Sequence, residues 1–191
     1  MSCRIALLTT LSALVLAVAF CTPVEAEYFQ SRPLEGREIQ PPTGSVCPRI
    51  LAKFSLPATL ESAEIDYAEL VLSVEIQQGS DAPCGIVAMR LARSWNDGAV
   101  GWHSPWINPG GDFTGVSSAA EIVNARDANK GVARVAVDVT DIVQHWVLHP
   151  GDNYGLGVTS TDPGVRLNAK QDDELTNTML LRVYFTSAQG K

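Results

Sequence analysis

The sequence has few of the residues from which enzymes usually build a catalytic centre. Its 191 residues include three histidines and four cysteines, and they contain no H-E-x-x-H, C-x-x-C or G-x-S-x-G pattern. His145 and His149 have the spacing of two metal ligands on a helix, but Pro150 disfavours helical geometry at His149. We therefore expect no enzyme. The weaker alternative, a small hydrolase or lyase, would need a carboxylate pair or His103.

Positive charge is also scarce. Lys and Arg number 14 against 21 Asp and Glu, which gives a net charge of -7. Because the basic residues are not clustered, we expect no nucleic-acid partner. The chain is 46% hydrophobic, which argues against disorder. Its length predicts one domain that buries roughly two thirds of the surface of the unfolded chain.

Only one long apolar run is present, and it lies at the N-terminus. Arg4 precedes an apolar stretch over residues 5–20, and residues 24–26 resemble a signal-peptidase cleavage site. The stretch is shorter than the roughly twenty residues that span a bilayer, so a signal peptide over residues 1–26 is favoured over a membrane anchor. We expect a secreted protein, outside the cell, in a periplasm or on the cell surface, with no membrane contact after removal of the leader.

Two of the four cysteines fall in this leader. Cys21 raises the alternative of a lipoprotein, but Phe20 stands where a small residue would be needed. The remaining pair, Cys47 and Cys84, predicts a disulfide in an exported protein. The bridge would close a loop of about 38 residues and stabilise the fold by roughly 3 to 4 kcal/mol. Two buried thiols are the alternative.

Period-two alternation of apolar residues dominates the chain after residue 48. Residues 27–48 are proline-rich and aperiodic, so we expect an arm or linker there. Ile50, Ala52, Phe54 and Leu56 then alternate with other residues, as in a half-buried strand. Further strands are predicted over residues 70–76, 86–91, 133–139, 155–159 and 179–185.

Helical periodicity appears once. Thr140 is placed to cap a short helix that carries Ile142, Val143 and Trp146 on one side. Short alternating strands with Gly- and Pro-rich turns are typical of two packed antiparallel sheets, because each sheet must hide its apolar face against another layer. The sequence therefore predicts an all-β sandwich with one short helix over residues 49–187.

Six segments follow one another along this domain: KFSLP (53–57), AELVLSV (68–74), RLARSWNDGAVGW (90–102), VDVTDIVQHW (137–146), DNYGLGV (152–158) and LLRVYF (180–185). In this order they resemble the DNRLRE domain, a family that includes the disaggregatase-related repeats and carbohydrate-binding module family 96. The similarity covers about residues 49–185. The family's N-terminal strand has only the proline-rich arm as its counterpart here, and residues 168–174 match loosely.

The resemblance implies a jelly-roll-like sandwich exported by bacteria or archaea. Members of the family are often attached to polysaccharide-active enzymes or surface proteins, and binding to acidic polysaccharide is reported for some of them. It implies no catalysis. We therefore expect a non-catalytic module that binds an extracellular or cell-wall polysaccharide. The alternative is a structural or adhesive surface module that contacts protein or matrix and has no sugar site.

The four tryptophans fall into two groups. Trp95, Trp102 and Trp146 occupy recurring positions of the matched segments, and we expect them in the core, where each would bury on the order of 150 to 250 Å². Trp106 lies in the irregular loop SPWINPGG, for which the sequence indicates no strand face that could hide an indole. Whether Trp106 is exposed or buried stays open.

An exposed Trp106, together with Tyr154, would give a sugar a flat apolar surface with polar groups nearby. If the sugar is a uronate, cations must meet its carboxylate, and the candidates are Arg90, Arg93 and Lys170. Each of these is otherwise an ordinary solvated charge. We expect no cofactor. A structural calcium ion would need carboxylates from loops, for which the candidates are Asp112, Asp138 and Asp141; Asp138 and Asp141 could instead fix the strand-to-helix turn.

Overall fold

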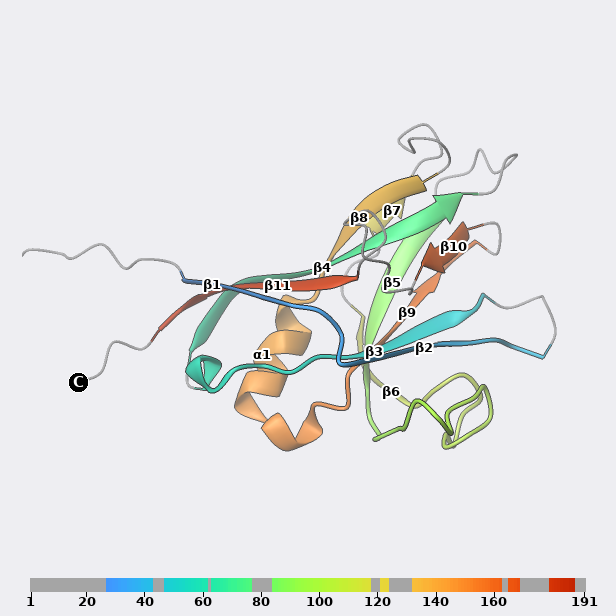
Figure 1. Cartoon of the computed structure of the whole chain (residues 1–191), viewed down its shortest axis with the longest axis horizontal. Helices are drawn as coiled ribbons and strands as arrows, with labels where there is room; N and C mark the ends of the chain where they lie inside the picture. The colour runs from blue at the N-terminus through green and yellow to red at the C-terminus, as the bar shows by residue number, and fades with distance from the viewer. Residues whose placement is uncertain are drawn as a thin grey trace, which may run out of the picture.

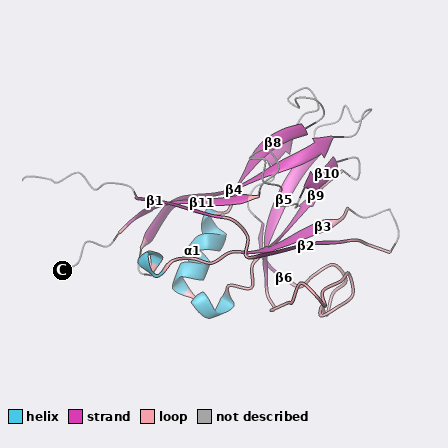
Figure 2. Ribbon diagram, viewed as in Figure 1, coloured by secondary structure: helices cyan, strands magenta, loops and turns pink. Residues whose placement is uncertain are grey.

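The computed structural model describes residues 27–42, 47–61, 63–76, 84–117, 121–123, 132–162, 165–168 and 179–187. The predicted signal peptide and the candidate ligand residue Lys170 lie outside these ranges. Within them, strands predominate and one α-helix is present (Figure 2). No helix in the described ranges is both long and apolar enough to cross a membrane.

The described strands form two antiparallel sheets. Sheet A consists of β1 (Glu27–Ser31), β4 (Glu64–Ile76), β8 (Val132–Asp138), β10 (Val165–Asn168) and β11 (Leu180–Thr186). Sheet B consists of β2 (Glu35–Ile39), β3 (Arg49–Lys53), β5 (Cys84–Leu91), β6 (Phe113–Ser117), β7 (Glu121–Val123) and β9 (Leu156–Ser160). The α-helix is α1 (Thr140–Leu148), and short 3₁₀ helices span Ala58–Leu60 and Pro150–Asp152.

The long strand β4 is central to sheet A. Glu69 pairs with Arg182 of β11 and with Asp138 of β8, so β8 and β11 lie on opposite sides of β4. β10 pairs with the C-terminal part of β4, and β1 pairs with β11. In sheet B the order is β2, β3, β9, β5, with β6 and β7 both on the far side of β5 (Figure 1).

The inner faces of the two sheets meet in one apolar cluster. Leu70 and Leu72 of β4 and Leu181 of β11 enter it from sheet A, and Ile50 and Val158 enter it from sheet B. All five are at most 1% exposed, and full burial of one such side chain is worth about 1.5 to 3 kcal/mol. Each sheet thus hides its apolar face against the other. The predicted antiparallel β-sandwich with one short helix is confirmed.

The helix α1 packs against the same cluster. Ile142, Val143 and Trp146 are buried in it, as the sequence predicts. Figure 1 shows α1 beside the segment that connects β3 to β4. Trp146 is therefore a core residue, as expected.

Thr140 does not cap α1. The N-cap position is Val139, whose side chain makes no capping hydrogen bond. The Thr140 hydroxyl donates instead to Asp138 Oδ1 at 2.6 Å, and it accepts a hydrogen bond from the backbone N–H of Ala68 at 2.9 Å. Asp138 Oδ1 also accepts the backbone N–H of Thr140 at 2.9 Å. Thr140 thus joins the helix to β4, and Asp138 fixes the strand-to-helix turn.

The described part of the segment 27–48 is not a linker, contrary to expectation. Its residues form β1, which pairs with β11, and β2, which pairs with β3, so it adds one strand to each sheet. Phe29 packs against the inner cluster and Ile39 is 1% exposed. The sequence signal was weak because both strands are five residues long and present mainly polar side chains outward; such short runs carry little periodicity.

Cys47 and Cys84 are free thiols in this structure, so the predicted disulfide is not formed. Cys84 begins β5 and is 1% exposed in the inner cluster, where its thiol lies 3.5 Å from the carbonyl oxygen of Gly85. Cys47 is half-buried. A disulfide requires the two Cβ atoms to be about 3.5 to 4.5 Å apart, which an even cysteine count alone does not ensure.

Candidate functional site

The outer face of sheet B is covered by the loop of residues 92–112. Trp95, Val100 and Trp106 of this loop form a second apolar cluster with Leu51 of β3 and Leu91 of β5. Trp102 and Phe113 pack against this cluster and are partly buried. The tryptophans on either side of the Asn-Asp-Gly turn therefore hold the loop onto the sheet. Sheet B is apolar on both faces as a result.

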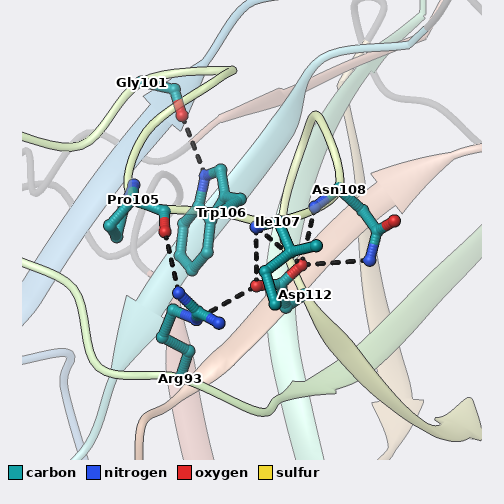
Figure 3. A network of polar contacts seen from close by, with 7 residues as sticks. All are labelled: Arg93, Gly101, Pro105, Trp106, Ile107, Asn108 and Asp112. Atoms are coloured by element: carbon teal, nitrogen blue, oxygen red, sulfur yellow. Dashed lines mark hydrogen bonds and ion pairs between the residues drawn. The ribbon is translucent and has the colours of Figure 1, made fainter.

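Trp106 is buried, so it does not form the exposed sugar platform for which it was a candidate. Its side chain is 7% exposed, and its indole Nε1 donates a hydrogen bond to the carbonyl oxygen of Gly101 at 2.9 Å (Figure 3). The loop hides the indole against the outer face of sheet B. Strand periodicity does not predict this because the loop itself supplies the covering layer.

Arg93 and Asp112 connect different parts of the same loop through an ion pair and hydrogen bonds. Arg93 Nε lies 3.1 Å from Asp112 Oδ2, and Arg93 Nη1 donates to the carbonyl oxygen of Pro105 at 3.2 Å (Figure 3). Asp112 also accepts the backbone N–H groups of Ile107 and Asn108, at 2.9 and 2.8 Å. These bonds, the one from Ile107 first, lower the pKa of the Asp112 carboxyl. Arg93 and Asp112 therefore hold the loop, and neither is placed to bind a uronate or calcium.

Two basic residues of β3 lie over the indoles of this loop. The Arg49 guanidinium lies 5.2 Å from the Trp102 ring centroid, and the Lys53 ammonium lies 4.7 Å from the Trp95 ring centroid. Arg49 Nη1 also donates to the carbonyl oxygen of Gly110 at 2.6 Å. Burial lowers the pKa of the Arg49 guanidinium. Both cations stabilise the loop through cation–π contacts.

The remaining predicted ligand residues are not brought together. Tyr154 is partly buried against the second apolar cluster, and its carbonyl oxygen accepts a hydrogen bond from the indole Nε1 of Trp95 at 2.9 Å. Arg90 is half-buried on β5, where it pairs with Leu156. Lys170 lies outside the described residues. Trp95 is 5% exposed and Trp102 is partly buried, so the expected core position holds fully for Trp95 and in part for Trp102.

His145 and His149, whose spacing alone would suit a metal, contact each other. The ring centroids of His145 and His149 are 4.7 Å apart, and His145 Nε2 lies 3.5 Å from Asp152 Oδ2. Across the described ranges, no group of three or more His, Cys, Asp or Glu side chains is arranged to hold a metal ion. The histidines thus join the end of α1 to the following turn.

A cavity of about 300 Å³ lies between the segment that follows β3 and the end of α1. Its walls combine apolar and polar side chains, among them Phe54, Leu60, Trp146, Ser55, Glu61 and Asn153. The indole Nε1 of Trp146 has no hydrogen-bond partner and is enclosed by protein atoms. The cavity therefore offers a ligand both apolar and polar contacts, but the enclosed Trp146 Nε1 is not one of them.

Three tyrosines from distant parts of the chain lie side by side on the outer face of sheet A. Tyr28 of β1 pairs with Tyr184 of β11, and Tyr184 pairs with Tyr67 of β4. Ring centroids are 5.1 Å apart for Tyr28 and Tyr184, and 6.1 Å apart for Tyr67 and Tyr184. Tyr184 faces outward because its neighbours Val183 and Phe185 point into the core. We call these three residues the tyrosine row.

The tyrosine row is accessible to solvent. Tyr28 is 51% exposed and Tyr67 is 39% exposed, while Tyr184 between them is partly exposed. Of the described strands, β1 pairs with β11 alone, so Tyr28 has a neighbouring ring on one side only. Its hydroxyl donates to Gln30 Oε1 at 2.6 Å. The row therefore combines apolar ring surface with phenol hydroxyls at the edge of a sheet.

A polar row runs parallel to the tyrosine row, one pleat further along the strands. Gln30, Arg182, Glu69 and Asp138 lie opposite one another in β1, β11, β4 and β8. Arg182 Nη1 donates to Glu69 Oε1 at 2.9 Å, and this hydrogen bond raises the pKa of the Arg182 guanidinium. The cation beside the tyrosines is thus already paired with a carboxylate.

Sequence reasoning missed the tyrosine row. Tyr28 lies in the segment expected to be a linker, and Tyr67 lies just before a predicted strand. Each tyrosine is unremarkable in its own strand, because it occupies one outward position. Only the register between β1, β11 and β4 brings the three together. A signal was available in EYFQS (27–31), where Phe29 between polar neighbours fits an edge strand.

No protein-family model matches this chain. A comparison with curated proteins also finds no match. The resemblance to the DNRLRE domain stays a prediction, and the arguments for function come from the geometry described above.

Proposed function

We propose that this protein is a secreted, non-catalytic module that binds an extracellular or cell-wall polysaccharide on the tyrosine row. The observation that carries the proposal is the row itself: three adjacent phenol rings on one sheet face, two of them more than a third exposed. A single exposed aromatic on a protein surface is common, whereas contiguous exposed apolar surface marks an interaction site.

The chemistry of the row suits a sugar chain. A pyranose presents C–H groups on its ring faces and hydroxyls around its rim. Tyrosine offers the matching combination, because its ring is apolar and its hydroxyl both donates and accepts hydrogen bonds. Successive tyrosines come from neighbouring strands, so the row runs across the sheet. A polymer lying in that direction would contact several rings at once, and each contact would add to the binding free energy.

Binding on sheet A is also supported because the outer face of sheet B is already covered by the protein's own loop. The loop of residues 92–112 occupies the outer face of sheet B. Trp106 and Arg93, the aromatic and the cation considered for a sugar site there, make internal hydrogen bonds. The tyrosine row presents its aromatic surface to solvent, and the resemblance to a family with carbohydrate-binding members favours the same class of ligand.

The proposal is tested by affinity electrophoresis through a panel of soluble polysaccharides. Tyr28→Ala removes the most exposed ring of the row and should weaken binding by roughly tenfold. Tyr28→Phe keeps the ring and should retain most of the affinity. Ile107→Ala is the matched control, since Ile107 is 75% exposed on the loop that covers sheet B, and it should bind as the wild type does.

Equal retention of Tyr28→Ala and Ile107→Ala on a polymer that binds the wild type would rule out the tyrosine row as the site. No retention of the wild type by any polymer in a broad glycan panel would contradict polysaccharide binding altogether. Circular dichroism and thermal melting of each variant separate a local loss of contact from unfolding.

A further inference from the structure

Exposed carboxylates stand close to the tyrosine row. Asp66 directly precedes Tyr67 at the register shift between β4 and β11, and its Oδ2 accepts a hydrogen bond from the Thr186 hydroxyl at 3.0 Å. Glu64 lies on the same strand as Tyr67, three residues away. Both acidic side chains are exposed. The region around the rings is therefore acidic, in keeping with the net charge of the whole chain.

The basic side chain nearest to the row in the strand register is Arg182, and it does not offset this charge. Its guanidinium is bound to Glu69 at 2.9 Å. Beyond Glu69 in the same polar row lies Asp138, which is exposed and accepts hydrogen bonds from Thr140. A ligand carboxylate arriving at the tyrosines would meet a paired cation and several carboxylates.

The carboxylates beside the tyrosine row are close enough to repel a negatively charged ligand bound on the rings. One residue along a strand advances about 3.3 Å, so carboxylates one to three residues from a tyrosine fall near or within the screening length of about 8 Å at physiological ionic strength. A polyuronate carries one negative charge on every sugar and would face this repulsion along its length. A neutral chain would not, and its hydroxyls can donate to the carboxylates.

Building on the proposed function, we infer that the tyrosine row selects a neutral polysaccharide and excludes polyuronates. The inference departs from what the family resemblance implies, because acidic polysaccharide is the ligand reported for some relatives. The cations that the sequence suggested for a uronate site do not lie beside the tyrosine row. Arg93 is bound to Asp112 and to the carbonyl oxygen of Pro105 in the loop over sheet B, and Arg90 lies on β5 of sheet B. The described part of sheet A places no unpaired cation in register beside the tyrosines.

The test compares two neutral polymers, hydroxyethyl cellulose and galactomannan, with two polyuronates, alginate and polygalacturonate, by affinity electrophoresis of the full mature chain. The wild type should be retained by at least one neutral polymer and by neither polyuronate at low salt. Tyr28→Ala should lose most of the neutral retention. Retention by a neutral polymer should change less than twofold between low and high salt, because no ligand charge is involved.

A charge-reversal variant sharpens the test. Glu64→Lys places a cation beside the row and should give at least fivefold stronger retention by alginate, while retention by the neutral polymer stays within twofold of wild type. Glu38→Lys is the matched control, because Glu38 is an exposed carboxylate on β2 of sheet B. It makes the same change in net charge and should leave alginate retention close to that of the wild type.

The outcomes separate the two claims. Wild-type retention by a polyuronate that Tyr28→Ala removes would overturn the preference for neutral chains while the tyrosine row stayed the site. Equal gains in alginate retention for Glu64→Lys and Glu38→Lys would show that net charge alone decides, and this too would overturn the inference. No retention by any of the four polymers would overturn the inference, and the broad glycan panel then decides the proposed function.

Discussion

Tyr28 lies directly opposite Tyr184 in the antiparallel pair of β1 and β11, with their ring centroids 5.1 Å apart. This contact joins one of the first described residues to one of the last. The exposed end of the tyrosine row therefore exists only when β1 is paired with β11. The N-terminal segment belongs to the sandwich and, under the proposal above, to its binding surface.

Ile39→Ala tests whether residues 27–42 are part of the fold. Ile39 is 1% exposed and packs in the second apolar cluster, so the substitution should lower the free energy of unfolding by about 2 to 5 kcal/mol. Leu34→Ala is the control, because Leu34 is 69% exposed and its loss should cost about 0.5 kcal/mol or less. Chemical denaturation measures both, and equal small effects would indicate a mobile arm instead of paired strands.

Trp106→Ala tests the structural role of the loop over sheet B. The indole is 7% exposed and hydrogen-bonded to Gly101, so truncation should cost about 3 to 5 kcal/mol of stability. Trp106→Phe keeps most of the packing and should cost less. If Trp106 instead bound sugar, Trp106→Ala would leave the melting temperature unchanged and abolish retention by polysaccharide. We expect the reverse pattern for protein that remains folded.

Asp112→Asn tests whether the ionised carboxylate of Asp112 stabilises the loop. Hydrogen bonds from Ile107 and Asn108 lower the pKa of Asp112 below its ordinary value of 3.8. A carboxyl with a lowered folded-state pKa contributes stability above its unfolded pKa, and this contribution is lost as pH falls through the folded pKa. The variant should therefore melt below the wild type at pH 6, and the gap should narrow below about pH 4. A gap that is constant across this range would contradict an ionised Asp112.

Gly155→Ala tests a close approach of two strands. Gly155 has φ of 88°, and a Cβ at this position would lie 2.3 Å from the carbonyl oxygen of Ala52. Both the positive φ and the clash with backbone are unfavourable, so we expect a loss of about 1 to 3 kcal/mol or more. Gly151→Ala is the matched control, because a Cβ there has no neighbour within 4 Å. Similar melting temperatures for the two variants would be inconsistent with this backbone geometry.

Thiol alkylation without reductant tests the state of the cysteines. Both Cys47 and Cys84 are free, one half-buried and the other 1% exposed. Iodoacetamide should label Cys47 in the native protein, and it should label Cys84 only after denaturation. Peptide mass spectrometry of exported protein distinguishes the two sites. Recovery of the two peptides joined by a disulfide, unlabelled even in denaturant, would restore the bridge that the sequence predicts.

The alternation of apolar residues was enough to predict the class of fold. From Ala68 to Val74 in β4 and from Leu181 to Phe185 in β11, every second side chain is apolar and buried, and a strand with one apolar face must pack against another layer. The helix was equally predictable, because Ile142, Val143 and Trp146 recur at helical spacing. Both signals are local, because they depend on residues within a few positions of one another. Burial of the apolar side stabilises the strand or helix whichever layer covers it.

What covers each outer face was decided only by the tertiary structure. Trp106 is hidden because its own loop folds back over sheet B, and Tyr28, Tyr184 and Tyr67 are neighbours because three strands far apart in the chain pair in one register. Register fixes which side chains meet across a sheet, and it is set by the packing of all strands together. No single strand of this protein contains that information, so a sequence that predicts a sandwich does not by itself locate the surface that binds.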